Sequence, residues 1–504
     1  MRILHVTNEF SPHGHGGVAE HVWAIARAQS QRHDVAIFTR FGDPSLPDGH
    51  VYTERRGRVT IRFFNRGALE WTPFERSYVH HDVEAEFKLF LGELRSDVVH
   101  FHDLETLGIG LLEIVRSLNI KSVMTARDFW PMCPLKHRVC RTDGSTCDTI
   151  DLAKCGPCLH GEHWNELRDA EVAEHEARRP APPETFSQSW KRLYRQRYDA
   201  TRGVKGRRPL AAVHATHTAL REAKWKAQEQ FHEQFGDSIE RRMDRFTRHM
   251  RDLDLLLAPS EFVRDQYIAR FGLSPAKALF SAASIDVGAV RVAARTPSKS
   301  LRVGFCGSAS RADGLRVLVD AFLEAAEQSQ VLELHVHVRC ADVDRGELEA
   351  LRERVLASPV AVRVHWHEDY EFGRFDAACA ALDLLVVPTL GLGNPSFELE
   401  RASLHGLPVL ASDSAGNAEF CGAHRIGRTF ARGAAHELAT ELLSLAIDPA
   451  ALAALASEPP AIKSPEYEGA LLALTYHQLL YGTFQAPTAA EQAAARSGEP
   501  EPQA

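Results

Sequence analysis

The chain has 504 residues, of which 44% are hydrophobic and 25% charged, as in ordinary globular proteins. This length has room for two or three domains, and the composition excludes collagen-like, fully disordered and small disulfide-stapled proteins. The 59 Lys and Arg residues against 67 Asp and Glu residues give a net charge of −8, which argues against a nucleic-acid partner.

The N-terminal segment MRILHVTNEF runs directly into a strand-like pattern, without the charged and then apolar leader of an exported protein. No stretch reaches the ~18 apolar residues that span a bilayer. We therefore expect a cytoplasmic protein, whose contact with a membrane would be peripheral.

Short apolar, β-branched runs alternate with helical patterns along the chain. In the first half the expected strands are 2–7, 34–40, 59–64, 97–102, 121–126 and 253–260. In the second half they are 301–307, 332–339, 362–367, 382–389 and 407–413. Such alternation predicts parallel sheets covered by helices on both faces, and it occurs twice. We expect an α/β protein with two separate parallel sheets.

The domain boundary is placed near residue 290 by the polar, Pro-containing segment at 292–300. The first domain is then 1–290, with a polar, helical insertion at about 159–250 that breaks the alternation. This insertion is either a solvated helical hairpin or an arm that grips an acceptor or touches a membrane. The second domain is 291–462, and the low-complexity tail at 485–504 is expected to be disordered.

A glycine-bearing loop, with Gly16 and Gly17 at its end, follows the first strand and is followed at once by a helix. Backbone N–H groups at a helix N-terminus can hold a phosphate or carboxylate, and glycine lets the ligand approach closely. Gly14, Gly16 and Ala19 match a dinucleotide fingerprint, but six residues separate the loop from the strand, and position 40 is Arg rather than an acid. A nicotinamide site is therefore disfavoured, and a plain structural turn is the other alternative.

The segment DVVHFHD at 97–103 places polar side chains at the end of a strand, where open α/β sheets bind ligands. His100 and His102 share one strand face, and Asp103 follows in the loop. A pair formed by His102 and Asp103 could orient an acceptor hydroxyl or accept its proton; a structural histidine is the alternative.

Five of the nine cysteines crowd into one segment: Cys133, Cys140, Cys147, Cys155 and Cys158. Cys155 and Cys158 form one C-x-x-C knuckle, but a second knuckle is missing. A structural zinc site, labile disulfides and plain packing thiols all stay open. Further along, HVH at 335–337 and HWH at 365–367 are histidine pairs that could bind a metal, although such pairs are more often ordinary strand residues.

Several motifs together carry a family resemblance. The start of the chain, DVVHFHD, DFWPMCP and LLLAPSEFVRDQYIARFG resemble retaining glycosyltransferases of the large sucrose-synthase-like family, family four, which have the GT-B fold. So do VGFCGSASRADGLRVLVDAFLEA, DLLVVPT, HGLPVLASD and GNAEF in the second half. The segment at 463–484 resembles the C-terminal helix that crosses back to the first domain in such enzymes.

The resemblance implies two Rossmann-like domains that face each other across a cleft. A nucleotide-sugar donor would bind mainly to the second domain, and a glycan, lipid-linked or small-molecule acceptor mainly to the first. The sugar would be transferred to an acceptor hydroxyl with retention of configuration, and no cofactor is implied for catalysis.

Carried over to this chain, the resemblance places Gly16 and Gly17 near the donor phosphates, His102 on the acceptor side, and Glu419 at an acidic position of the family. We expect one cleft to be lined by residues at strand ends or in the loops just beyond them. These residues are Gly16, Gly17, Gly307, Arg311, Asn394, Ser396 and Glu419.

The chain departs from the family at positions that carry donor chemistry. Ser308 and Asp313 stand where an Arg and a Lys normally neutralise the diphosphate, a charge that Arg311 could partly supply. Gly393 and Arg401 stand at the paired glutamates.

A third departure is Arg127, which replaces the His of the "HD" motif. Two functions follow from this mixture: a glycosyltransferase with rearranged donor contacts, or a catalytically impaired homologue that acts as a nucleotide- or glycan-binding partner protein. An oxidoreductase that uses NADP is a third, more distant alternative.

Overall fold

The computed structural model describes residues 1–14, 16–67, 74–140, 144–160, 239–290, 298–340, 344–368, 370, 372–456 and 462–486. Most of the expected insertion and linker, and nearly all of the expected disordered tail, lie outside these residues. The expectations about those segments stay predictions.

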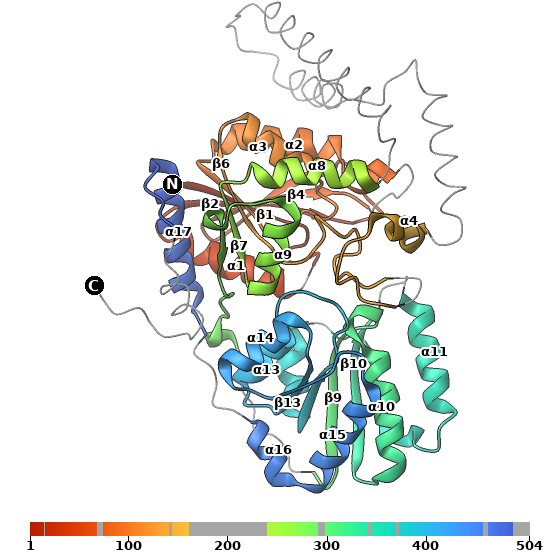
Figure 1. The fold of residues 1–504 in the computed structure, drawn as a ribbon. Coiled ribbons are helices and arrows are strands. Elements are labelled where there is room, and N and C mark those ends of the chain that lie inside the picture. The colour runs from red at the N-terminus through yellow and green to blue at the C-terminus, as the bar shows by residue number, and fades with distance from the viewer. Residues whose placement is uncertain are drawn as a thin grey trace, which may run out of the picture.

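Each half of the chain forms its own sheet (Figure 1). The first sheet has the order β3-β4-β2-β1-β5-β6-β7-β8, and the second has the order β11-β10-β9-β12-β13-β14. All neighbouring strands are parallel except β3, which runs antiparallel to β4. Two such sheets, covered by helices on both faces, confirm the α/β class with two Rossmann-like domains.

The strands of the first sheet are β1 (Arg2–Thr7), β2 (Asp34–Phe41), β3 (Val51–Arg56), β4 (Val59–Asn65), β5 (Val98–Phe101), β6 (Lys121–Thr125), β7 (Leu255–Ala258) and β8 (Ala278–Phe280). Those of the second are β9 (Leu301–Ser308), β10 (Leu332–Arg339), β11 (Val364–His367), β12 (Leu384–Val387), β13 (Val409–Ser412) and β14 (Arg428–Phe430).

The helices of the first domain are α1 (Gly17–Gln29), α2 (His81–Leu94), α3 (Gly110–Ser117), α4 (Leu152–His160), α8 (Ile239–Arg251) and α9 (Glu261–Phe271). Those that follow are α10 (Leu315–Gln328), α11 (Arg345–Leu356), α12 (Phe375–Ala380), α13 (Phe397–Leu404), α14 (Ala415–His424), α15 (Ala435–Ile447), α16 (Pro449–Leu455) and α17 (Pro465–Tyr481).

Three strands are not predicted by the sequence, and each lacks the signal of a buried strand. The strand β3 lies at the edge of its sheet, and its residues alternate between half-buried and exposed, so they form no apolar run. It joins β4 through a tight turn at Gly57, whose φ of +61° favours glycine. The strands β8 and β14 have only three residues each.

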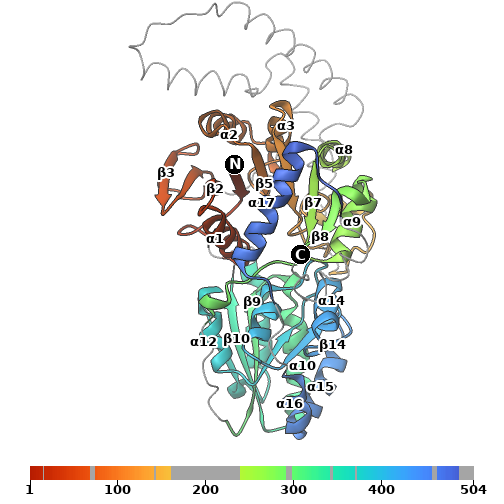
Figure 2. The same cartoon turned by 90° about the vertical axis from the view of Figure 1, so that its left-hand side faces the viewer.

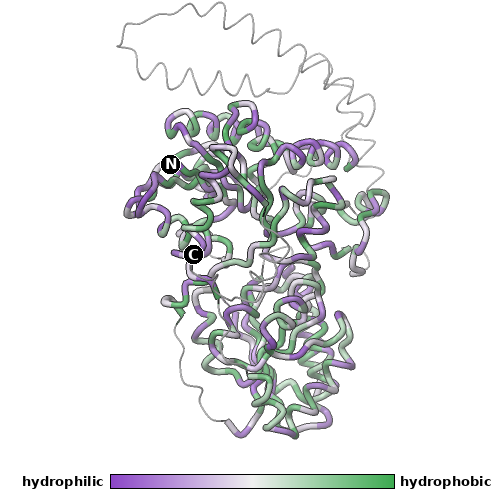
Figure 3. Tube along the Cα trace, turned by 60° about the vertical axis from the view of Figure 1, so that its left-hand side comes forward, coloured by the Kyte–Doolittle hydropathy of each residue, from purple (hydrophilic) through white to green (hydrophobic). Residues whose placement is uncertain are grey.

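Apolar side chains fill both faces of each sheet. In the first domain Phe87 and Phe246 belong to one cluster, and Val22 and Ile25 to the cluster on the opposite face. Figure 3 shows the apolar colour following the inner strands, while the surrounding helices alternate between apolar and polar. Burial on both faces is why the parallel strands read as continuous apolar runs.

The last helix of the described chain, α17, returns from the second domain and lies against α1 of the first (Figure 2). Ser464 caps it by accepting from the N–H of Tyr467, Pro465 occupies its first position, and Gly482 ends it at a φ of +68°. The helix thereby brings Glu468 and Tyr476 into the interior of the first domain.

Within the described residues, no single helix has the length and apolar composition needed to cross a membrane; α15 and α16 pass that test only as a pair, bent by 113°.

Candidate active site

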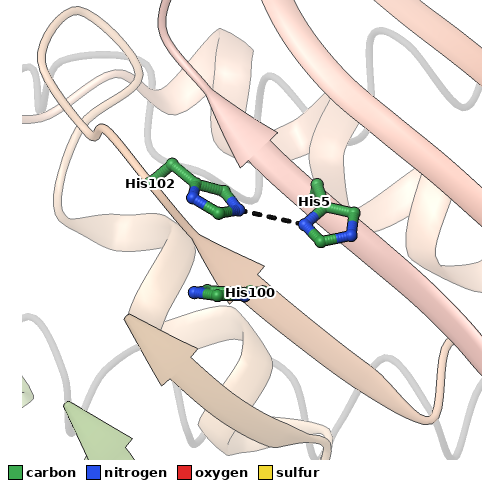
Figure 4. A group of neighbouring side chains, drawn as sticks. All are labelled: His5, His100 and His102. Atoms are coloured by element: carbon green, nitrogen blue, oxygen red, sulfur yellow. Dashed lines mark hydrogen bonds between the residues drawn. The ribbon is translucent and has the colours of Figure 1, made fainter. Parts of the chain in front are cut away.

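A cluster of histidines lies in the first domain where β1 and β5 run side by side. His5 on β1 pairs in register with His100 on β5, and His102 follows β5 immediately. All three side chains are buried, and their rings lie close together near the carboxyl ends of the two strands (Figure 4). This is the edge at which parallel sheets bind ligands.

Hydrogen bonds fix which nitrogen of two of these rings carries the proton. The NH2 group of Gln29, at the end of α1, donates to the carbonyl oxygen of Gly469 (3.2 Å). Its Oε1 therefore accepts from Nε2 of His5 (2.8 Å). It follows that Nδ1 of His5 accepts from Nε2 of His102 (3.0 Å), and that Nδ1 of His102 keeps a lone pair.

That nitrogen, Nδ1 of His102, is buried and has no hydrogen-bond partner in the described part of the chain. Burial lowers the pKa of His5 to about 4 and the pKa of His102 well below its ordinary value, so both rings are neutral at pH 7. The cluster thus contains one buried, neutral acceptor without a hydrogen-bond partner among the described residues.

The third ring, His100, is bound on both sides. Its Nδ1 meets the hydroxyl of Tyr476 (2.6 Å), and its Nε2 meets the hydroxyl of Thr125 (2.8 Å). The ligand atoms of His5, His100 and His102 lie within 4.8 Å of one another, which is close enough for a metal ion. Five of the six ring nitrogens already have partners, however, so the cluster is a hydrogen-bonded network rather than a metal site.

Asp103 belongs to a different group from the histidines. Its carboxylate accepts from the N–H of Glu105 (2.9 Å), and it lies near Asp128 and Lys136. Burial raises the pKa of Asp103, the charge of Asp128 raises it further, and Lys136 opposes this rise. Among the described residues, His102 is hydrogen-bonded to His5 and not to its expected partner Asp103.

Arg127, which replaces the His of the family motif, ties β6 to two helices. Its guanidinium donates to Nδ1 of His21 on α1, whose Nε2 donates to Glu468 on α17 (2.9 Å). Glu468 also accepts from the N–H of Ser284 (2.8 Å). The substitution therefore has a structural role next to the histidine cluster.

Several of the predicted donor-site residues form the contact between the domains. A Cβ on Gly17 would lie 2.2 Å from the ring of Phe397 at the start of α13. The amide of Asn394 donates to the carbonyl oxygens of Ala126 (2.8 Å) and Arg127 (2.9 Å). Glycine at position 17 therefore permits a close approach that any larger residue would prevent.

Three further predicted residues lie at or bind the N-terminal end of a helix. Gly16 precedes α1 in an extended conformation, with open space where its Cβ would be. Ser396 caps α13 by accepting from the N–H of Leu399 (3.1 Å). Both oxygens of Glu419 accept from backbone N–H groups at the start of α9 in the first domain (2.9 and 2.8 Å), so this acid anchors one domain to the other.

Gly307 and Arg311 lie at the end of β9 and in the turn beyond it. In the same turn, the N–H and the hydroxyl of Ser308 both donate to the carboxylate of Asp313 (2.9 and 2.5 Å). The two residues that replace the family's cations therefore bind each other. Arg311 lies against Gly144 in the cysteine-rich segment of the first domain. A Cβ placed on Gly144 would be 3.2 Å from the nearest guanidinium nitrogen of Arg311.

Arg339 is a cation that the sequence analysis missed. It ends β10 directly opposite Ser308 of β9. Burial raises the pKa of Asp313, and the positive charge of Arg339 opposes this rise. The available signal was its place at the end of the strand that neighbours the Gly307 loop. Arg339 is therefore a second candidate, beside Arg311, for contact with a donor phosphate.

Arg401, at the second glutamate position of the family, holds α13 in place. Its guanidinium binds both oxygens of Asp376 (2.9 and 3.0 Å) and one of Glu20 on α1 (3.1 Å). On the same helix, burial raises the pKa of Glu398 to about 7 and of Glu400 to about 8. Arg401 thus links the two domains. At the first glutamate position of the family, Gly393 has open space where its Cβ would be.

A cavity of about 170 Å³ lies at the boundary between the domains. Its lining is mostly apolar and includes Glu400, Lys463 and, of the predicted donor-site residues, only Glu419. Gly17, Asn394 and Glu419 contact the other domain, and only Glu419 lines this cavity, so that all the predicted residues line one cleft stays a prediction.

The five clustered cysteines divide between a loop and a helix. Cys133, Cys140 and Cys147 precede α4, which carries Cys155 and Cys158. Burial, followed by the nearby thiols of Cys133, Cys158 and Cys147, raises the pKa of Cys155 to about 12. No three of these sulfur atoms fall within 4.8 Å of one another in the described chain, so zinc binding here stays a prediction.

Two family models match the sequence: "Glycosyltransferase Family 4" over residues 15–148 and "Glycosyl transferases group 1" over residues 300–448. With the two-sheet fold, they establish the chain as a family-4-like glycosyltransferase of the GT-B fold. No curated protein matches the chain in sequence.

Solved structures with the same fold cover nearly the whole chain. Sucrose-phosphate synthase from Thermosynechococcus elongatus is 13% identical, with a TM-score of 0.56 over 95% of this chain and 96% of that one. Anabaena HepE in complex with UDP and glucose is 12% identical, with a TM-score of 0.53 over 95% and 98%. A trehalose-6-phosphate synthase structure from E. coli, bound with UDP-2-fluoro glucose, is 11% identical, with a TM-score of 0.56 over 96% and 98%.

Proposed function

We propose that the protein transfers a sugar from a nucleotide-sugar donor to an acceptor hydroxyl, with retention of configuration, in the synthesis of a glycan or glycoconjugate. The observation that carries this proposal is the lone pair on Nδ1 of His102, buried at the ligand-binding edge of the first sheet. A hydroxyl that donates to this nitrogen would be oriented for attack, and a positioned base of this kind contributes ~10²–10⁴-fold to a rate. Asp103, one residue further, would set the polarity of the acceptor pocket.

The donor would be held by loops of the second domain at the boundary. Gly16 and Gly17, with Gly307, Asn394, Ser396 and Glu419, would line the donor site, and Arg311 and Arg339 would meet the charge of the diphosphate. The complexes of HepE with UDP and glucose, and of the E. coli structure with UDP-2-fluoro glucose, support testing uridine diphosphate sugars first.

The acceptor would be a glycan, a lipid-linked glycan or a small molecule, and a lipid-linked acceptor would bring the protein into peripheral contact with a membrane. The chemistry needs no metal or other cofactor at the reacting centre. A catalytically impaired homologue that binds a nucleotide or glycan for a partner is the second candidate, which the Ser308–Asp313 pair favours, because both diphosphate cations of the family are missing.

A thermal-shift screen with nucleoside diphosphates, followed by a turnover assay with the sugar forms of those that bind, tests both candidates. Arg311→Ala and Arg339→Ala should each weaken the affinity for the nucleotide by about tenfold, as expected for a charge-assisted contact of ~1.5 kcal/mol. Arg316→Ala is the matched control, because Arg316 pairs with Glu347 on the surface (2.7 Å).

Binding without sugar turnover would leave the impaired homologue as the function. The absence of any shift with nucleoside diphosphates would refute the enzyme, and a shift with NADP alone would indicate the oxidoreductase. Under the proposed function, His102→Ala should lower turnover by at least ~10²-fold while the donor still binds.

A further inference from the structure

A second group of histidines lies on the outer strand pair of the second sheet. His335 and His337 on β10 are directly opposite His365 and His367 on β11 in the parallel register. Side chains at positions i and i+2 point to the same face of a sheet, so the four imidazoles share one face. Glu333, two residues before His335, lies on that face as well.

The opposite face of the same strands is ordinary core. Leu334 and Val336 are fully buried there and belong to the main apolar cluster of the second domain. Parallel strands usually carry apolar residues on both faces, because helices cover both. Here the outer pair replaces one apolar face with imidazoles and a carboxylate, which are ligands for metal ions.

The spacing of these groups fits one metal ion. The ligand atoms of Glu333, His335 and His365 all lie within 4.8 Å of one another. Nδ1 of His335 is hydrogen-bonded to Nε2 of His367 (3.3 Å), which leaves Nε2 of His335 as the nitrogen available to a metal ion. The ring centroids of His337 and His367 are 4.2 Å apart.

Two of the nitrogens lack a partner that would explain their burial. Nε2 of His335 and Nε2 of His337 are buried without a hydrogen bond among the described residues. The nearest carboxylate oxygen of Glu333 is 3.9 Å from Nε2 of His335, beyond hydrogen-bond distance. Buried polar atoms left unpaired are costly, so each one in a native structure calls for a bound group or another explanation.

We propose that this face binds a divalent transition-metal ion through Glu333, His335 and His365, while His367 orients the ring of His335 through the hydrogen bond to its Nδ1. Imidazoles with one carboxylate suit Zn²⁺, Ni²⁺ and Cu²⁺ rather than Mg²⁺ or Ca²⁺, which prefer oxygen ligands alone. Because the ligands come from two strands, the ion joins the short edge strand β11 to β10. Its role is to stabilise the second domain, independently of sugar transfer.

Calorimetric titration of the metal-stripped full chain with Ni²⁺ tests the proposal. We expect one ion per chain at this site, and an increase in the dissociation constant of at least tenfold in both His335→Ala and His365→Ala. The two variants lie on different strands, so a folding defect in one leaves the other as a test. His436→Ala is the matched control, because His436 is an exposed histidine of the same domain, paired with Glu324 (2.5 Å), and should bind Ni²⁺ as the wild type does.

Unchanged affinity in both strand variants would overturn the proposal and would direct attention to the cysteines or to the histidines of the first domain. Nickel bound through thiolates would also give strong sulfur-to-metal absorption, which a site of imidazoles and a carboxylate lacks. The metal should raise the thermal midpoint of the wild type and of His436→Ala only; an equal rise in His335→Ala would likewise refute the site.

Discussion

Replacing Gln29 by Glu would place a carboxylate beside Nε2 of His5, which lies 2.8 Å from the present amide oxygen. In the wild type, burial keeps the pKa of His5 at about 4, and its neutral Nδ1 accepts from His102. A protonated His5 would instead donate from Nδ1 to Nε2 of His102. The proton of His102 would then have to lie on its Nδ1, the nitrogen proposed to receive the hydrogen bond from the substrate. The proposed acceptor for the substrate hydroxyl would then be lost.

The size of this effect follows from the charge pair. An opposite charge at such a distance typically shifts a pKa by about 1–3 units, so the pKa of His5 should rise from about 4 to roughly 5–7 in Gln29→Glu. Activity that disappears only near pH 4 in the wild type should therefore disappear at a pH about 1–3 units higher. The variant also loses the N–H bond to Gly469, which should cost about 1–3 kcal/mol of unfolding free energy.

The assay is the release of nucleoside diphosphate as a function of pH, combined with imidazole ¹⁵N chemical shifts that report the tautomer of His102. Gln29→Leu is the control, because it removes the same hydrogen bonds without adding a charge and should reduce activity without moving the acidic limb upward. Coincident acidic limbs in Gln29→Glu and the wild type would refute this reasoning. So would a wild-type His102 that carries its proton on Nδ1.

Three further outcomes are expected. Burial lowers the pKa of His5 from 6.5 to about 4, so on acidification the unfolded chain takes up a proton at His5 before the folded chain does. The contribution of His5 to the unfolding free energy is therefore complete above about pH 6.5 and should fall by about 3 kcal/mol towards pH 4. Urea unfolding at a series of pH values would measure this fall. Asn394→Ala removes two bonds to the first domain and should lower the unfolding free energy by about 1–3 kcal/mol in calorimetry, whereas an unchanged value would mean that water replaces the amide. Elemental analysis of protein purified under reducing conditions should find one zinc ion per chain more in the wild type than in Cys155→Ser, and equal zinc contents would contradict this prediction.

The strand–helix alternation was sufficient to predict the two sheets, because buried parallel strands need continuous apolar runs. The same logic could not reveal β3 or β14, where an edge position or a length of three residues removes that signal. The positions of candidate residues at strand ends were predictable for a related reason: all parallel strands of a sheet end at one edge. His102 was found in this way.

What the sequence could not predict is the state of that histidine. The proton position on His102 depends on His5 and Gln29, and through Gln29 on a carbonyl group of α17 near the other end of the chain. His5 does interrupt an apolar run, which indicates a buried polar contact, but nothing in periodicity names its partners. Likewise, the loss of cations at Ser308 and Asp313 was visible in the sequence, whereas their mutual hydrogen bond was not.

The chain passes between the domains twice, and the two passages run side by side. The N–H of Ile285, after the last strand of the first sheet, donates to the carbonyl oxygen of Lys463, just before α17 (3.2 Å). In Figure 1 this seam is on the left, whereas the first-domain segment near α4 meets the second domain on the right, with Asp148 and Arg432 3.5 Å apart. Two adjacent covalent connections on one side act as a hinge, which allows rotation but resists separation. Opening would therefore begin on the side of α4, by parting the ion pair of Asp148 and Arg432, which salt weakens, and the rate of ligand exchange should rise with ionic strength.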